Sequence, residues 1–368
     1  MDLHLHDAPH PADLFVTGMM RSGTTIANRI CEISFGRPML YQPCMASMVG
    51  AKRRFLESVG FGGEVYPIGP LFGETRPDQG DFARWLDRQG RRSENETAAS
   101  GFALEQAAEW RRIAGLGDRD PVGAKEILCE EFARHFGEHG IHPIIVLRDP
   151  RDMICSAVGA GGRQFAGRIR PTLYMLHMWR RSAAFAIELQ ASGLGSVVVY
   201  ERLARSPWTE MNALADASGG RVQVQVSQAE FMRRLEGLGA NSSHHRMSGV
   251  STRSIGSYRT RLSRSVVEYV EAVCAPEMSL FGMNLDAVVR DPISTIRAFR
   301  EPWAIGHPSV PSGYSTDPRL LDLEQRRIDR ILDGGCPDEE TEELFIRRAA
   351  RDAVCSLESA YRPIPKAA

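Results

Sequence analysis

Two glycines with the spacing of a phosphate-binding loop follow a short apolar run near the start of the chain. Residues 14–17 read LFVT, and residues 18–25 read GMMRSGTT. A loop between a strand and a helix directs backbone N–H groups and the positive end of the helix dipole at one anion. A nucleotide kinase has Lys directly after the second glycine, whereas this chain has Thr24 at that position. The positive charge of the loop comes instead from Arg21. We therefore expect an anion site that disfavours a polyphosphate held with Mg²⁺; an ordinary glycine turn is the alternative.

A second cation follows another apolar run. Residues 144–147 read IIVL, and Arg148 comes directly after them. Open α/β sheets bind ligands at the carboxyl ends of their strands, and Arg grips phosphate with two parallel hydrogen bonds. Ser156 lies eight residues further on, in a predicted helix whose N-terminus faces the same crevice. The alternative for Arg148 is a structural ion pair with Asp149 or Asp152.

Lysine is scarce in this chain, which draws attention to Lys125. Of 45 Lys and Arg residues, only Lys52, Lys125 and Lys366 are lysines; codon usage in a GC-rich genome explains most of this bias. Lys125 ends the segment 121–125, which reads PVGAK and is consistent with a short strand. An ammonium group at a strand end could stabilise a leaving oxygen. A surface lysine paired with Glu126 is the alternative.

Strands and helices alternate around these residues, which predicts a three-layer α/β fold with a mostly parallel central sheet and a P-loop. The expected strands are 14–17, 121–125, 144–147 and 197–200. The expected helices are 81–89, 102–113, 128–137, 151–158 and 173–190. Residues 35–80 are rich in Gly and Pro and indicate extended loops with little regular structure.

The chain divides into three parts in this interpretation. Residues 1–11 form a polar tail, residues 12–285 the α/β domain, and residues 286–368 a helical C-terminal extension. Within the extension, 321–332 and 338–361 have the pattern of amphipathic helices. The extension could cap a pocket or form a homodimer interface.

Composition excludes several classes of protein. The 368 residues are 43% hydrophobic and carry a net charge of -1, which argues against disorder and against a generic nucleic-acid binder. No secretory signal or membrane-spanning stretch is visible. The seven cysteines are scattered without a C-x-x-C pair, so reduced thiols in a cytoplasmic protein are the simplest interpretation.

No metal site is expected. The histidines of the tail, His4, His6 and His10, are most simply part of a frayed polar segment. His135 and His139 share a helical spacing that could bind a metal, but a solvated helix face is the favoured interpretation.

These motifs together resemble those of the sulfotransferases that use 3′-phosphoadenosine 5′-phosphosulfate. The run Arg21-Ser22-Gly23-Thr24-Thr25 after an apolar strand resembles their 5′-phosphosulfate loop. The strand ending in Arg148, followed by Ser156, resembles the pair that holds the 3′-phosphate in that family. The resemblance covers roughly residues 12–285 and implies the same fold, with this donor as co-substrate and no metal requirement.

Weaker resemblances extend along the chain. Tyr200, where the strand 197–200 runs into YERL, resembles a third family element, and Ser251 begins a segment that resembles the one closing over the nucleotide. Lys125 resembles the lysine at a strand end in tyrosylprotein and related sulfotransferases. Glu74, in GETR, resembles the proposed base of the tyrosylprotein enzymes, although it lies farther from the loop here.

The base is therefore the least settled residue. Many other sulfotransferases have Glu-Pro soon after the first helix, where this chain has Gln42 before Pro43, and an amide cannot take a proton. His244 and His245 are the runner-up bases, because imidazole titrates near neutrality. A plain surface carboxylate is the alternative for Glu74.

The sequence predicts a sulfotransferase that moves a sulfuryl group in line to an acceptor hydroxyl on a small molecule, a carbohydrate or a peptide. The resemblance assigns donor binding to Arg21, Ser22, Gly23, Thr24, Thr25, Arg148, Ser156, Tyr200 and Ser251, and catalysis to Glu74, Lys125 and Arg21. Two other functions stay open: a P-loop kinase acting on a small molecule, and a nucleotide-binding module without activity.

Overall fold

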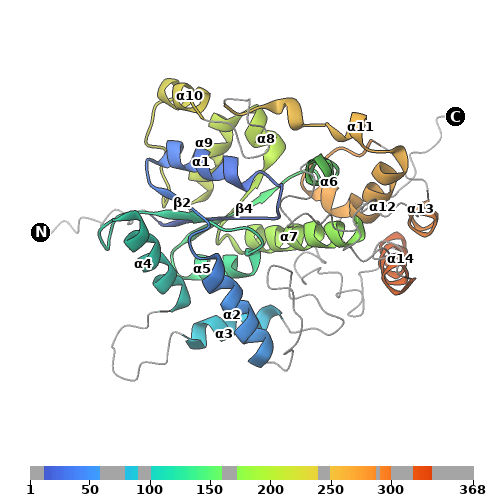
Figure 1. Cartoon of the computed structure of the whole chain (residues 1–368), viewed down its shortest axis with the longest axis horizontal. Coiled ribbons are helices and arrows are strands. Elements are labelled where there is room, and N and C mark those ends of the chain that lie inside the picture. Colours follow the sequence, from blue (N-terminus) through green and yellow to red (C-terminus); the bar gives the residue numbers. More distant parts are fainter. Residues whose placement is uncertain are drawn as a thin grey trace, which may run out of the picture.

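Five short strands form one parallel sheet at the centre of the molecule (Figure 1). The computed structural model describes residues 12–58, 79–89, 101–159, 172–238, 249–286, 291–299 and 318–333. The sheet order is β2-β3-β1-β4-β5, and all neighbouring strands are parallel. The strands are β1 (Leu14–Thr17), β2 (Met39–Tyr41), β3 (Gly123–Lys125), β4 (His142–Leu147) and β5 (Ser196–Val199).

Helices cover both faces of this sheet (Figure 1). The helices up to the last strand are α1 (Thr24–Phe35), α2 (Met45–Ser58), α3 (Gln79–Gln89), α4 (Phe102–Ala114), α5 (Ala133–Glu138), α6 (Pro150–Gly159) and α7 (Thr172–Ser192). Those that follow are α8 (Tyr200–Arg205), α9 (Pro207–Ala217), α10 (Gln228–Glu236), α11 (Tyr258–Arg261), α12 (Arg264–Leu280), α13 (Pro292–Ala298) and α14 (Pro318–Leu332).

The central strands are apolar because both of their faces are covered. Successive side chains point to opposite faces of a strand, and in β1 the Phe15 ring packs with Trp110 of α4 and Phe136 of α5. Its neighbours Leu14 and Val16 belong to the buried cluster that includes α1, α9 and α10. The predicted three-layer, parallel α/β fold is confirmed.

The structure corrects the sequence interpretation of residues 35–58. We expected extended loops there, but β2 and α2 occupy much of this stretch. Strand β2 has only three residues and pairs only with β3, so its register depends on a partner more than eighty residues away. The helix expected over 128–137 begins instead as a 3₁₀ turn, Glu130–Phe132, which continues into α5.

The carboxyl ends of the strands meet at one edge of the sheet. Strand β1 lies between β3 and β4, so the chain connections leave it in opposite directions along the sheet. Ligands of open α/β sheets bind at such a switch point. The ends of β1, β3, β4 and β5 carry the glycine loop, Lys125, Arg148 and Tyr200 respectively.

A buried group of charges attaches α14 to α7 and α12. Glu324 of α14 accepts hydrogen bonds from Arg180 Nη1 at 2.9 Å and Arg327 Nε at 3.1 Å, and its Oε1 lies 2.7 Å from His177 Nε2. Arg180 Nε also donates to Glu277 of α12 at 2.8 Å. The division of the chain near residue 286 stays a prediction, and the expected helix over 338–361 lies outside the described residues.

The Glu324 cluster gives a stability prediction. We expect Glu324→Gln to lower the free energy of unfolding by about 3–5 kcal/mol, because it leaves two buried guanidinium groups without their shared carboxylate. Denaturant unfolding measures this change. Asp322→Asn, which removes only an exposed pair with Arg326, is the matched control and should cost less than about 1 kcal/mol. Equal effects of the two substitutions would contradict the interpretation.

Candidate active site

The glycine loop folds back on itself because three of its residues have positive φ angles. They are Gly18 at 145°, Arg21 at 68° and Gly23 at 91°. A Cβ atom on Gly23 would lie 2.3 Å from the Tyr200 ring, so only glycine allows this close approach. A Cβ atom on Gly18 would lie 2.4 Å from the carbonyl oxygen of Val146. The loop is thereby packed closely against β4 and the end of β5.

The loop and the end of β4 are joined through their two arginines. Arg21 Nε donates a hydrogen bond to Ser156 Oγ of α6 at 2.9 Å, and Arg148 Nη1 donates to the Arg21 carbonyl at 3.2 Å. Burial, together with the nearby Arg148 charge, lowers the pKa of Arg21. Two guanidinium groups held this close favour an anion between or beside them.

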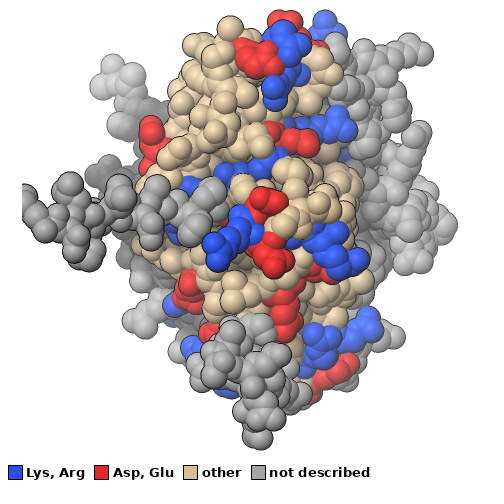
Figure 2. Space-filling model, turned by 90° about the vertical axis from the view of Figure 1, so that its left-hand side faces the viewer, with Lys and Arg blue, Asp and Glu red and all other residues tan. Residues whose placement is uncertain are grey.

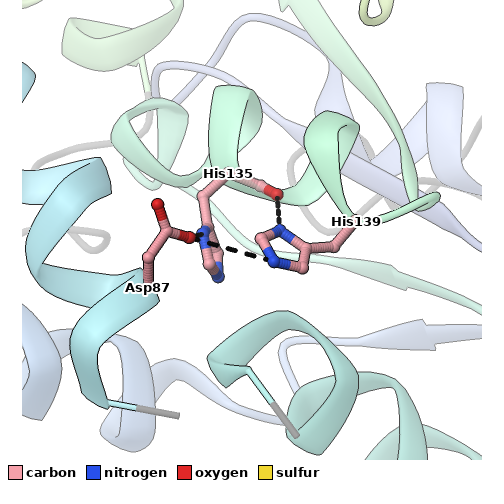
Figure 3. A group of neighbouring side chains, drawn as sticks. All are labelled: Asp87, His135 and His139. Atoms are coloured by element: carbon pink, nitrogen blue, oxygen red, sulfur yellow. Dashed lines mark hydrogen bonds and ion pairs between the residues drawn. The ribbon is translucent and has the colours of Figure 1, made fainter. Parts of the chain in front are cut away.

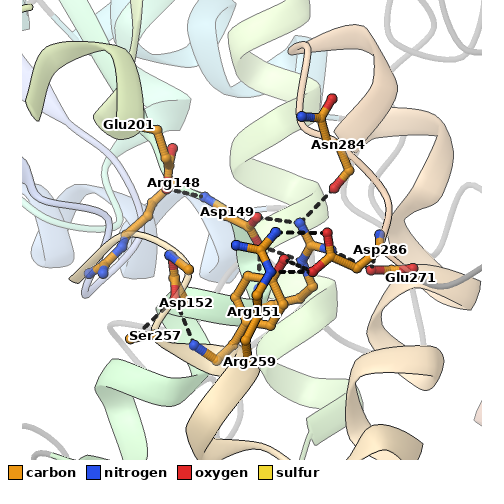
Figure 4. Close-up of polar contacts among 12 residues, drawn as sticks. Arg148, Asp149, Arg151, Asp152, Glu201, Ser257, Arg259, Glu271, Asn284 and Asp286 are labelled. Atoms are coloured by element: carbon orange, nitrogen blue, oxygen red, sulfur yellow. Dashed lines mark hydrogen bonds and ion pairs between the residues drawn. The ribbon is translucent and has the colours of Figure 1, made fainter. Parts of the chain in front are cut away.

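Arg148 has no ion pair among the residues that the structure describes. Its Nη2 donates to the Ser254 carbonyl at 2.9 Å, and its guanidinium lies 4.6 Å from the centre of the Tyr200 ring. The Asp149 carboxylate instead accepts a hydrogen bond from Arg151, whose Nη2 lies 2.6 Å from Asp149 Oδ2 (Figure 4). The alternative that Arg148 serves as a structural ion-pair partner is therefore wrong.

Asp152 binds the late segment 251–258 to α6. Its carboxylate accepts hydrogen bonds from Gly256 N at 2.6 Å, Ser257 Oγ at 2.9 Å and Tyr258 N at 3.1 Å (Figure 4). Tyr258 also donates its hydroxyl to Asp286 at 2.6 Å. These bonds fix the segment that carries Ser251 and Ser254, which line the same cavity as Arg148.

Lys125 is buried at the end of β3, with only 2% of its surface exposed. Its Nζ lies 4.0 Å from the centre of the Tyr41 ring. Tyr41 itself is 58% exposed. Burial lowers the pKa of Lys125 to about 8, against the opposing charge of Glu126. The alternative of a surface lysine is therefore wrong.

Glu126 serves the architecture beside this lysine. Its Oε1 accepts a hydrogen bond from Cys44 N at 2.7 Å, which connects β3 to the turn after β2. Burial raises the pKa of Glu126 to about 7. Glu126 is not among the residues that line the cavity, so this geometry gives no support for it as the base.

A cavity of about 590 Å³ lies between these elements. Its described lining includes five cationic side chains and no carboxylate; the cations are Arg21, Lys125, Arg148, Arg253 and Arg261. The predicted site residues Gly23, Thr24, Thr25, Ser156, Tyr200 and Ser251 also line it. The volume is that of a small-molecule site, and its charge suits a polyanion.

Two buried polar atoms in this region have no hydrogen-bond partner among the described residues. Arg148 Nε belongs to a residue that lines the cavity, whereas Ser22 Oγ belongs to a fully buried loop residue that does not line it. Buried polar groups are nearly always hydrogen-bonded, so such atoms call for a ligand or water. Both belong to the residues that the sequence assigned to donor binding.

Arg253 and Arg261 were not predicted from the sequence. Both are exposed, both line the cavity, and neither forms an ion pair with a described residue. Nothing in the sequence separates them from the chain's other arginines, because their place depends on how Asp152 fixes the late segment.

The base candidates Glu74, His244 and His245 lie outside the described residues. Gln42, which replaces the glutamate of the Glu-Pro pattern, lines the cavity with a φ angle of 50°. Its amide can donate or accept a hydrogen bond but cannot take the acceptor's proton.

Figure 2 shows one face of the molecule, on which basic and acidic side chains are interspersed rather than gathered into one basic patch. None of the described helices is both long and apolar enough to cross a bilayer.

Comparison with known proteins gives matches among solved structures. No family model and no curated protein matches the chain. Three similar structures are the sulfotransferase domain of the olefin synthase from Synechococcus PCC 7002, STF9 from Mycobacterium avium, and the sulfotransferase domain from the curacin biosynthetic pathway. All three are sulfotransferases.

The similarity to these structures is low. Sequence identities are 16%, 16% and 14%, and TM-scores are 0.39, 0.40 and 0.41, in the same order. The matches cover 72%, 76% and 75% of this chain and 93%, 79% and 99% of the others. Because the scores are low, the function has to rest on the site itself.

Asp152 gives a prediction for the late segment. We expect Asp152→Asn to loosen residues 256–258, because an amide keeps one acceptor oxygen but turns N–H donors toward at least one of the three donors that now face a carboxylate. Hydrogen exchange of the Gly256 and Tyr258 amides should become at least about tenfold faster. Ser257→Ala, which removes only one of the three bonds, should leave these amides nearly as protected as in the wild type. Unchanged exchange in Asp152→Asn would contradict this role.

Proposed function

We propose that this protein is a sulfotransferase that transfers a sulfuryl group from 3′-phosphoadenosine 5′-phosphosulfate to an acceptor hydroxyl. The observation that carries the proposal is the cavity at the ends of β1, β3 and β4, whose described lining has five cations and no carboxylate. This donor carries two separate anionic groups, and the cavity has a cationic element for each. The acceptor hydroxyl belongs to a small molecule, a carbohydrate or a peptide.

The proposed donor contacts follow from the two joined arginines. Backbone N–H groups of residues 22–25, with Arg21, bind the 5′-phosphosulfate, since a loop at a helix N-terminus favours an anion. Arg148 and Ser156 bind the 3′-phosphate through charge-assisted hydrogen bonds. The unpartnered Arg148 Nε supports this assignment. The Tyr200 ring lies against the Arg148 guanidinium, and Ser251 also lines the cavity.

Lys125 has the proposed role of stabilising the leaving group. In the transfer, the sulfur–oxygen bond to the 5′-phosphate breaks while a new bond to the acceptor oxygen forms, so negative charge grows on the bridging oxygen. A buried ammonium is well suited to stabilise that charge, because it is poorly screened by water. The acceptor proton passes to a base, for which Glu74 is the proposed residue and His244 or His245 the alternatives.

The lining of the cavity speaks against the kinase alternative. Phosphoryl transfer from a nucleoside triphosphate uses Mg²⁺, which oxygen ligands such as carboxylates hold. Thr24 replaces the loop lysine of kinases, and no Asp or Glu is among the described residues of the lining. The residues therefore favour a donor whose charge is met by arginine and lysine.

Donor binding is testable with Arg148→Ala. The product 3′,5′-adenosine diphosphate should raise the melting temperature of the wild type, and Arg148→Ala should bind it about 10- to 100-fold more weakly, as expected for losing a hydrogen bond to a charged group. Thermal-shift titration measures both. Arg202→Ala, an exposed arginine paired with Glu210, is the control and should bind like the wild type. No stabilisation of the wild type would refute the proposed donor.

The role of Lys125 predicts a pH dependence. Its pKa of about 8 means that the ammonium form, which the reaction needs, is lost as the pH rises through 8. We expect the transfer rate of the wild type to fall above that pH. Lys125→Arg, which stays charged, should be slower but should not show this fall.

A second substitution separates chemistry from binding. Lys125→Ala should lower the transfer rate about 10²- to 10³-fold, the usual cost of removing one group that stabilises developing charge. Binding of 3′,5′-adenosine diphosphate should change little. A rate equal to that of the wild type would remove Lys125 from the mechanism.

A further inference from the structure

Two histidines and an aspartate meet on the opposite side of the sheet from α1, far from any role in the proposed reaction. Asp87 lies near the end of α3, His135 lies in α5, and His139 directly follows α5 (Figure 3). Asp87 Oδ1 is 3.0 Å from His135 Nδ1 and 3.8 Å from His139 Nε2. The three ligand atoms all lie within 4.8 Å of one another.

Asp87 Oδ1 and His135 Nδ1 form a buried pair at the centre of this group, 3.0 Å apart. The two side chains attract each other by charge and by hydrogen bonding. An ion bound here would take the place of that contact, with the carboxylate oxygen and the ring nitrogen as its ligands.

His139 is held in the form that a metal ligand needs. Its Nδ1 lies 2.8 Å from the carbonyl oxygen of His135, which can only accept, so the Nδ1 proton is donated there (Figure 3). The lone pair of the neutral ring is then on Nε2, which faces Asp87. A backbone carbonyl behind the distal nitrogen is the usual support of a metal-bound histidine.

We propose that Asp87, His135 and His139 bind a divalent transition-metal ion, for which Zn²⁺ is the best match to two imidazoles and one carboxylate. Three protein ligands leave a fourth tetrahedral position for water. The group lies beside the start of α4, where a Cβ atom on Gly101 would be 3.5 Å from His139 Nε2. The absence of a side chain at Gly101 keeps that side of the group uncrowded.

Two existing contacts of His135 are lost when the ion binds, its contact with Asp87 and its hydrogen bond from Ala103. The Ala103 N–H group donates to His135 Nε2 at 3.3 Å, whereas a neutral His135 that binds metal through Nδ1 carries its proton on Nε2. This hydrogen bond is long, and three metal–ligand bonds replace it. The sequence interpretation of a solvated helix face is wrong for His135, which is 0% exposed.

The proposed ion would join α3 to α5. Phe82 and Trp85 of α3 pack in the aromatic cluster that includes Phe132, so the ion would support an existing contact between these elements. Arg134 of α5 pairs with Glu138 at 2.8 Å and adds only a longer-range attraction to Asp87.

Cobalt substitution tests the proposal directly. The test uses the full chain with His4, His6 and His10 changed to Ala, so that the tail histidines do not bind the metal. After chelator treatment, this protein should bind one equivalent of Co²⁺ with the visible absorption of a tetrahedral nitrogen and oxygen site, without sulfur charge-transfer bands, and Zn²⁺ should displace the Co²⁺. In the same background, His139→Ala and Asp87→Asn should each weaken binding by at least about 100-fold.

The control is Glu109→Ala, which removes a carboxylate paired with Arg112 on α4, leaves the Arg134–Glu138 pair intact and should leave Co²⁺ binding unchanged. Circular dichroism establishes that each variant is folded, and Asp87→Asn preserves the side-chain volume if His139→Ala proves unstable. Two results would overturn the proposal: no tetrahedral Co²⁺ spectrum in the parent protein, or equal Co²⁺ affinity in the parent and both ligand variants.

Discussion

The contact between the glycine loop and the end of β4 is the constraint on which the site depends. Arg21 reaches across to Ser156, and Arg148 reaches back to the Arg21 carbonyl, at 2.9 Å and 3.2 Å. This places two positive charges in one cavity with no carboxylate among its described lining residues. Without an anion such an arrangement is costly, because like charges in a partly buried space repel. The cavity is thus preorganised for a negatively charged ligand.

Buried carboxylates outside the cavity hold this arrangement in place. Asp149 binds Arg151, which also contacts Glu271 and donates to the Asn284 carbonyl at 2.7 Å (Figure 4). Asp152, on the same turn of α6, holds the late segment through three hydrogen bonds. The described carboxylates of this region therefore stabilise the structure around the cavity, and none of them lines the cavity that the cations face.

Much of the fold and part of the site could be predicted from the sequence. The strands at 14–17 and 144–147 are visible as apolar runs because both sheet faces are covered, and parallel pairing then brings Arg21, Lys125 and Arg148 to one edge. The motif residues Ser156, Tyr200 and Ser251 also line the cavity, although their roles in donor binding stay proposals.

Other features depend on distant partners and leave no local signal. Strand β2 is three residues long and exists through its pairing with β3. The sequence shows Asp152 as a possible partner of Arg148, yet its carboxylate is taken by residues a hundred positions later. Asp87 meets His135 only because α3 packs on α5. Such contacts are set by tertiary structure, which local spacing does not encode.

The most direct test of the central claim is the nucleotide selectivity of the cavity. Titration calorimetry in the presence of EDTA would compare 3′,5′-adenosine diphosphate with adenosine 5′-monophosphate, which lacks the second phosphate. We expect the bisphosphate to bind at least about 100-fold more tightly, because only its second phosphate can accept the charge-assisted hydrogen bonds from Arg148 and Ser156. Equal affinity for both nucleotides, or binding of ATP with Mg²⁺ in preference to the bisphosphate, would contradict it.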